Sequence, residues 1–179
     1  KAVCSACPAL QHVAFRNLAD LGYDPAEIKA IAAGFQVPHY DAGTGKLTTK
    51  PGTPTDHFPP VAYAGTGHPP DLSLITKARE GGAAYVYSLV TGFAPQPAEL
   101  LKKFPDSKTP DGLYFNPYFA NLNIAMPPPL TADGQVTYSD GTPATKEQMA
   151  TDVSAFLVWT AEPTLERRRQ VGWPVVLFL

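Results

Sequence analysis

The chain has 179 residues and a formal net charge of −2, with 44% hydrophobic and 17% charged residues. This length and composition predict one globular domain with a single hydrophobic core. Nucleic acid is a poor candidate for a partner, because a net charge of −2 leaves no extended cluster of Lys and Arg to neutralise phosphates. The 20 prolines and 14 glycines predict short helices joined by long ordered loops, since both residue types disfavour long helices and strands.

Four helices are predicted in chain order. The first starts at a capping box, Asp24 to Glu27, and ends at Gly34. The second covers residues 71–80, between a Pro-Pro and a Gly-Gly pair, and the third covers residues 83–91 with a glycine as its cap. The fourth starts at a second capping box, Thr145 to Gln148, and ends at a proline, residue 163.

Little regular structure is predicted between these helices. Residues 135–138 lie between two Asp-Gly turns and predict one strand of a small hairpin. The composition of residues 36–70 and 93–129 predicts loops. Such long loops are unusual in a compact domain unless a cofactor fills the centre and organises them.

The C-terminal residues 166–179 combine three consecutive arginines with an apolar stretch that contains Trp173. That pattern is typical of the point at which a chain enters a membrane. The stretch is less than half of the roughly 20 residues that a spanning helix needs. We therefore expect residues 166–179 to form a basic stop and the beginning of a truncated C-terminal membrane helix, with packing on the domain as the alternative.

Cys4 and Cys7 are the only cysteines, and their spacing suits three kinds of chemistry: a redox disulfide, half of a zinc site, or thioether bonds to haem vinyl groups. A zinc site would need more ligands, and the four histidines are widely spaced: His12, His39, His57 and His68. A redox disulfide would need a strand-then-helix context that is missing here. Haem attachment normally has a histidine directly after the second cysteine, where this chain has Pro8. Two buried or disulfide-linked cysteines remain an equally good interpretation of the pair by itself.

The order of motifs along the chain resembles the cytochrome c1 family. The matching segments are CSAC at 4–7, VAFRNLAD at 13–20, KPGTP at 50–54, PPDLSLITKAREGG at 69–82, YSLVTG at 87–92, YFNPYF at 114–119, IAM at 124–126, PPL at 128–130 and DGTPAT at 140–145. Further matches continue through AEP at 161–163 to Arg167. The resemblance covers nearly the whole chain.

The resemblance implies a mainly α, c-type cytochrome fold in which residues 1–165 form the haem domain. It implies an electron-transfer subunit of a cytochrome bc1-type complex, which passes electrons from a Rieske iron–sulfur protein to soluble cytochrome c and is not an enzyme by itself. The implied partners are cytochrome b, the Rieske subunit, soluble cytochrome c and the membrane. The implied location is the periplasmic face of a bacterial inner membrane, or the intermembrane-space face of the mitochondrial inner membrane.

The same resemblance implies the site residues. Cys4 and Cys7 would bind haem c covalently, Met126 would be the sixth iron ligand, and Arg79 would lie near a propionate. Pro70 would pack against the proximal side of the ring, and Tyr85 would contact its edge. Without the resemblance, Met126 could equally fill a gap in the core, and Arg79 would belong to a solvated helix face.

Two departures from the family pattern affect the haem. Pro8 has neither an imidazole nor a backbone N–H, so it cannot ligate iron. His12, four residues further on, would be displaced about 6 Å along a helix axis, which is too far to replace it without rearrangement. The loop at 58–68 is also shorter than in relatives. Three explanations stay open: a single-base change in an altered fragment, a five-coordinate haem held by two thioethers and Met126, or a haem-free structural or docking subunit.

Overall fold

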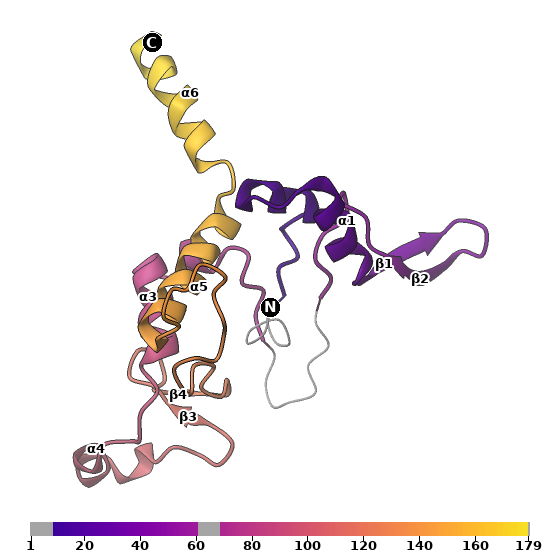
Figure 1. Ribbon diagram of the computed structural model, residues 1–179. Coiled ribbons are helices and arrows are strands. Elements are labelled where there is room, and N and C mark those ends of the chain that lie inside the picture. Colours follow the sequence, from indigo (N-terminus) through magenta and orange to yellow (C-terminus); the bar gives the residue numbers. More distant parts are fainter. Residues whose placement is uncertain (1–8, 61–68, 179) are drawn as a thin grey trace.

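The computed structural model describes residues 9–60 and 69–178, and the fold is mainly α. Helices η1 and α1 lie on one side of the molecule, and α3 and α5 pack side by side on the other (Figure 1). In chain order the described elements are η1 (Phe15–Leu21), α1 (Pro25–Ala33), β1 (Gln36–Asp41), β2 (Lys46–Pro51), α2 (Ile75–Ala78), α3 (Gly82–Thr91), α4 (Ala98–Lys103), η2 (Pro105–Ser107), β3 (Tyr114–Phe115), β4 (Asn123–Ile124), α5 (Lys146–Ala161) and α6 (Leu165–Phe178).

The capping signals position α1 and α5 as the sequence predicts. At α1, Asp24 Oδ1 accepts hydrogen bonds from the amides of Ala26 and Glu27 at 2.7 and 2.8 Å, and Glu27 Oε2 accepts one from the Asp24 amide at 2.9 Å. At α5, Thr145 Oγ1 accepts from the Gln148 amide at 3.1 Å. A full capping box would also have the Gln148 side chain bonded back to the Thr145 amide. That part of the prediction is wrong, because the Gln148 side chain donates to a carboxylate further along α5.

The helix predicted over residues 71–80 is wrong in its first half. Only Ile75–Ala78 is helical, as α2. The preceding residues form a turn in which Asp71 Oδ1 accepts from the Ser73 amide at 2.8 Å, and the Leu72 amide bonds to the Ala9 carbonyl at 2.9 Å. A long-range pairing therefore replaces the first turn of the expected helix. The predicted third helix, by contrast, is confirmed as α3.

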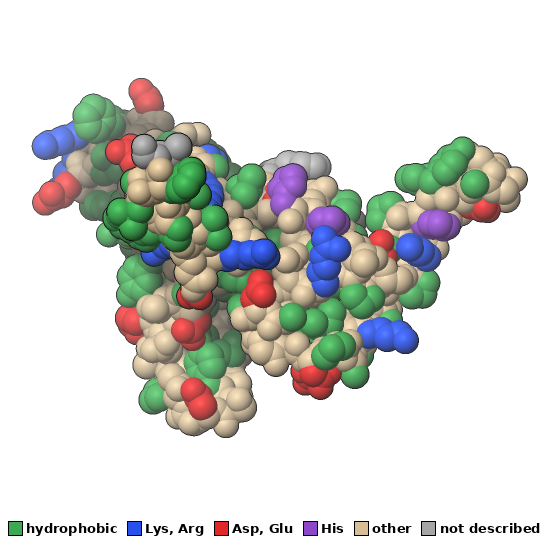
Figure 2. Space-filling view, turned by 90° about the horizontal axis from the view of Figure 1, so that it is seen from above, with side chains coloured by type: hydrophobic (Ala, Val, Ile, Leu, Met, Phe, Trp, Pro, Cys, Tyr) green, Lys and Arg blue, Asp and Glu red, His purple; other side chains and the backbone are tan. Residues whose placement is uncertain are grey.

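Strands β1 and β2 form a hairpin over residues 36–51, a segment that was predicted to be loop. β1 and β2 pair antiparallel, with Tyr40 opposite Leu47 and Asp41 opposite Lys46. The turn between them is held by Asp41, whose carboxylate accepts from the Gly43 amide at 2.9 Å and from the Thr44 hydroxyl at 2.7 Å. These hydrogen bonds, with that of the Thr44 hydroxyl the largest contribution, lower the pKa of Asp41. The hairpin projects from the rest of the molecule (Figures 1 and 2).

The strand predicted at 135–138 is wrong, because this segment is held by side chains rather than by a second strand. The Tyr138 hydroxyl donates to Asp152 Oδ2 on α5. This hydrogen bond is the main reason why the pKa of Tyr138 is raised to about 12. The Gln135 side chain accepts from the amide of Thr131 at 2.7 Å, which closes the loop on itself. The long segment before α5 is thus an ordered loop.

The core is an aromatic and aliphatic cluster that joins the N-terminal elements to α5. Its buried members are Phe15, Leu18, Ile28, Ala32 and Val37, and its partly buried members are Ile31, Phe35, Phe58 and Trp159. The ring of Phe15 lies 4.3 Å from that of Phe58 and 5.3 Å from that of Phe35, centroid to centroid. Because Trp159 belongs to α5, the burial of this cluster also stabilises the contact between the two sides of the molecule.

Helix α6 leaves the body of the molecule and buries none of its side chains (Figure 1). Figure 2 shows hydrophobic side chains gathered at its C-terminal end, where Trp173 is 71% and Phe178 91% exposed. Within residues 9–60 and 69–178, no helix is both long and apolar enough to cross a bilayer.

The accessible surface of the chain is large for its mass. It amounts to 12,149 Å² for 19.2 kDa, whereas a compact monomer of this mass exposes about 8,400 Å². The hairpin, α4 and α6 extend away from the core and contribute to this surface (Figure 1). The fold therefore leaves much area for contacts outside the chain.

A close approach at the end of α3 gives a test of the packing. A Cβ added at Gly92 would lie 2.4 Å from Tyr118 Cδ2 and 2.6 Å from the Ser88 carbonyl oxygen. We expect Gly92→Ala to lower the free energy of unfolding by about 2 kcal/mol through overpacking, as measured by urea denaturation. Gly172→Ala is the control, because a Cβ there meets no atom within 4 Å. Equal stability of the two variants would contradict the packing described.

Candidate functional site

The segment that follows the cysteine pair is bound to the segment that follows Pro70. The residue two positions after Cys7, Ala9, forms a parallel bridge with Asp71. The Gln11 amide donates to Asp71 Oδ2 at 2.7 Å, and the His12 amide donates to Ser73 Oγ at 3.2 Å. These contacts bind residues 9–12, which follow the cysteine motif in the sequence, to the Asp-Leu-Ser segment at 71–73.

Asp71 is the electrostatic centre of this junction. Partial burial by itself would raise its pKa, but the hydrogen bonds from Ser73 and Gln11 outweigh that effect and hold the pKa of Asp71 below its usual value. The carboxylate thus accepts one hydrogen bond from each of the two chain segments. Ser73 is fully buried, so the junction includes a buried polar side chain that is satisfied by hydrogen bonding.

Three of the predicted site residues lie on one stretch of chain that turns from α2 into α3. Pro70 is exposed directly before the Ala9–Asp71 bridge. Arg79 is exposed at the C-terminal end of α2, where its Nη1 donates to the Ala78 carbonyl at 3.1 Å. Tyr85 is half-buried in the first turn of α3. Two glycines with positive φ, residues 81 and 82, reverse the chain between Arg79 and Tyr85.

Met126 lies half-buried in the loop that follows β4. Asn116 begins the connection between β3 and β4, which precedes this loop, and it is fully buried. Its amide donates to the Leu122 carbonyl at 2.8 Å, its Nδ2 donates to the Leu89 carbonyl on α3 at 2.8 Å, and its Oδ1 accepts from the Tyr118 amide at 3.0 Å. The β3–β4 connection, which leads to the Met126 loop, is therefore attached to the same helix that carries Tyr85.

The other predicted residues lie outside the part of the chain that the structure describes. Cys4, Cys7 and Pro8 all belong to residues 1–8, so their distances to Met126 are not defined. His12 is described and exposed, but the residues around it form a bridge and a turn instead of a helix. The helical placement considered for His12 is therefore wrong.

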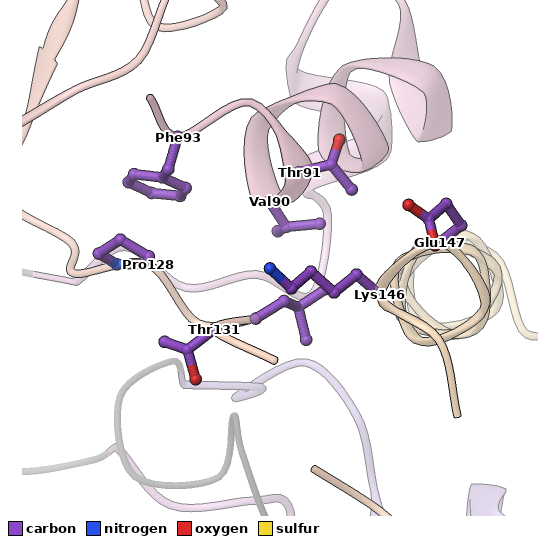
Figure 3. Close-up of a pocket in the computed structure, with 8 residues that line it drawn as sticks. Val90, Thr91, Phe93, Pro128, Thr131, Lys146 and Glu147 are labelled. Carbon is purple, nitrogen blue, oxygen red and sulfur yellow. The ribbon is translucent and has the colours of Figure 1, made fainter. Parts of the chain in front are cut away.

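A cavity of about 330 Å³ lies between the end of α3, the proline-rich loop after Met126 and the start of α5 (Figure 3). Its lining residues are Val90, Thr91, Phe93, Pro128, Leu130, Thr131, Lys146 and Glu147. Figure 3 shows the Val90 and Lys146 side chains pointing toward this space from α3 and α5. None of the described site residues predicted from the sequence lines it. It is thus a separate hollow beside the Met126 loop.

The chemistry of the donor set fits a covalently attached haem in part. The sequence supplies two thiols for thioether bonds, and a half-buried thioether at Met126 suits an axial ligand. Among residues 9–60 and 69–178, no group of three or more His, Cys, Asp or Glu side chains could hold a metal ion. The sequence therefore supplies groups for attachment and for one axial position, and it has Pro8 where haem attachment normally has a histidine directly after the second cysteine.

Sequence reasoning missed two residues that organise the site, Asp71 and Asn116. Each has a recognisable local signal, because Asp71 follows a proline pair and has a serine two positions later, and Asn116 precedes a proline. Neither signal indicates the distant partner, and that partner gives each residue its role.

The sequence model of the Cytochrome C1 family matches residues 1–179. A cytochrome c1 of Rhodospirillum rubrum is 45% identical over 194 aligned positions, which cover 99% of this chain and 71% of the relative. The mitochondrial heme protein cytochrome c1-2 of Solanum tuberosum is 41% identical, with 99% of this chain and 69% of the relative covered. A mitochondrial cytochrome b-c1 complex catalytic subunit of Candida albicans is 39% identical, with 99% and 62% covered. The similarity thus spans this chain from end to end and part of each relative.

The junction at Asp71 generates a stability test. We expect Asp71→Asn to lower the free energy of unfolding at neutral pH by about 2 kcal/mol, because two hydrogen bonds to a charged acceptor are weakened. Since the pKa of Asp71 is lowered by folding, its contribution is present above the usual carboxyl pKa of about 4 and is lost as the pH falls through the folded value. The difference between variant and parent in urea denaturation should therefore shrink in acid.

Asp20→Asn, at an exposed position in η1, is the control and should leave stability nearly unchanged. Hydrogen exchange at the Gln11 and Ser73 amides should accelerate in Asp71→Asn only. A pH-independent difference between Asp71→Asn and the parent would be inconsistent with a charged acceptor at this junction.

Proposed function

Because this chain belongs to the cytochrome c1 family, we propose that it is the haem-carrying electron-transfer subunit of a respiratory cytochrome bc1-type complex. The observation that carries the proposal is the match to the family over all 179 residues. In this role the chain accepts electrons from a Rieske iron–sulfur protein and passes them to soluble cytochrome c. It is an electron carrier within a quinol:cytochrome c oxidoreductase, not a catalyst by itself.

The proposed haem site consists of residues from three regions of the chain. Cys4 and Cys7 would form the thioether bonds, Met126 would ligate the iron, and Arg79 would pair with a propionate. When bound, the haem supplies one-electron redox chemistry. The chain's own part is to hold the group and to limit the access of water, with Pro70 and Tyr85 packing against it. The contacts of Ala9, Asp71 and Asn116 support this proposal, because they brace the segments on which the ligands lie.

Pro8 makes the haem of this chain different from the family pattern. We propose a haem held by two thioethers and Met126, with the second axial position left without the family's imidazole. An open axial position and a changed reduction potential follow from that arrangement. The haem-free docking subunit is not favoured, because the plant relative at 41% identity is named a heme protein.

The same proposal assigns residues 1–165 to the haem domain and residues 166–179 to the start of a membrane anchor. The three arginines and the exposed Trp173 support a position at a membrane surface. Cytochrome b and the Rieske subunit would be the partners within the complex. The site would face the periplasm in a bacterium or the intermembrane space in a mitochondrion.

A spectrum and an intact mass test the haem. We expect the purified chain to show c-type bands in the reduced-minus-oxidised absorption spectrum and a mass increase of one haem. Met126→Leu should lower the reduction potential and change the spectrum, because a thioether ligand favours ferrous iron. Met149→Leu is the matched control, since the only other methionine is buried on α5, and it should keep both the spectrum and the potential. A colourless protein with the mass of the bare chain would overturn the proposal.

The axial position has its own test. We expect Pro8→His to supply the missing imidazole and to convert the spectrum to that of a six-coordinate, low-spin haem. Binding of carbon monoxide to the reduced parent should be lost or strongly weakened in the variant. An identical spectrum and identical carbon monoxide binding in parent and variant would show that another residue already occupies this position.

A further inference from the structure

Helix α6 is attached to the body of the molecule through very few contacts. Only three residues, Glu162, Pro163 and Thr164, connect it to α5. The Leu165 amide bonds to the Glu162 carbonyl at 3.1 Å, and the Arg168 amide bonds to the Thr164 carbonyl at 2.9 Å. Because no described side chain of α6 is buried, apolar packing does not fix its direction.

The side chain of Glu162 binds two cations from two different elements. Its Oε2 lies 3.0 Å from Lys77 Nζ on α2, and its Oε1 forms an ion pair with Arg168 Nη2 on α6. The Glu162 side chain is only 16% exposed, whereas those of Lys77 and Arg168 are 54% and 66% exposed.

Neighbouring interactions make this contact more rigid. The Thr76 hydroxyl donates to the Leu157 carbonyl at 3.2 Å, so α2 is bound to α5 one turn away from the Lys77–Glu162 pair. The hydrogen bond from Lys77 lowers the pKa of Glu162 more than desolvation raises it, and the charge of Arg168 lowers it further. Glu162 is therefore a carboxylate with both oxygens occupied, at the point where α2, α5 and α6 meet.

We propose that Glu162 is a positioning residue that fixes the direction of α6 relative to the body by holding Arg168 of α6 and Lys77 of α2 at once. We call the two ion pairs of Glu162 the clamp. Any role of this clamp in electron transfer rests on the proposed function. The link is Arg79, the proposed propionate partner, which directly follows α2. If α6 is the start of an anchor, the clamp sets the orientation of the haem domain relative to the rest of the complex. The clamp itself can be tested with or without haem.

The test uses ¹⁵N relaxation of the backbone amides in the full chain, with any haem kept reduced. In the parent, we expect the amides of α6 to have order parameters near about 0.85, as in a rigid body. In Glu162→Gln, the α6 values should fall below about 0.6 while those of α3 and α5 stay unchanged. Glu166→Gln is the matched control, because this exposed acid on α6 makes no described ion pair.

A charge exchange separates the clamp from general destabilisation. Glu162→Arg should release α6. Glu162→Arg combined with Arg168→Glu restores only the ion pair between positions 162 and 168, so the order of α6 should recover in part, because Lys77 stays without its partner. If Glu162→Gln fails to fold, Arg168→Gln tests the α6 side alone with the Lys77 pair intact. Order parameters of α6 that are already low in the parent, or that are unchanged in all variants, would overturn the clamp. Loss of haem with intact order of α6 would instead count against the proposed function only.

Discussion

The fold depends on the junction between residues 9–12 and residues 71–73. The two segments are about sixty positions apart, yet the Asp71 carboxylate binds the amide of Gln11 and the amide of Ser73 at once. A charged acceptor that is partly buried forms stronger hydrogen bonds than a neutral one, and removing it would leave two amides without partners. The position of residues 9–12 relative to the start of α2 depends on this contact.

A second set of contacts holds the β3–β4 connection and the N-terminal helices. Asn116 attaches the β3–β4 connection, which leads to Met126, to α3: its buried Nδ2 donates to the Leu89 carbonyl, and its Oδ1 accepts from the Tyr118 amide. The aromatic cluster around Phe15 joins the N-terminal helices to Trp159 on α5. Polar contacts thus hold the β3–β4 connection on α3, and apolar packing holds the N-terminal helices on α5.

The large accessible surface of the chain fits a subunit of a larger complex. It exceeds the area of a compact monomer of the same mass by more than a third, as the estimate of about 8,400 Å² implies. Exposed apolar side chains on α6 and the projecting hairpin account for part of this area. The membership in the cytochrome c1 family gives a reason for such surfaces, because a subunit of a complex can bury them against its neighbours.

The sequence by itself determined the family, the ends of α1 and the start of α5, because motif order and capping boxes are properties of adjacent residues. It also showed that Pro8 cannot ligate iron, which follows from the chemistry of one side chain. Only the tertiary structure decided that residues 36–51 form a hairpin, that α2 is a single turn, and that Tyr138 binds Asp152 in place of a strand partner. These features depend on contacts between residues that are separated in the sequence. Local propensity does not predict which of these residues contact one another.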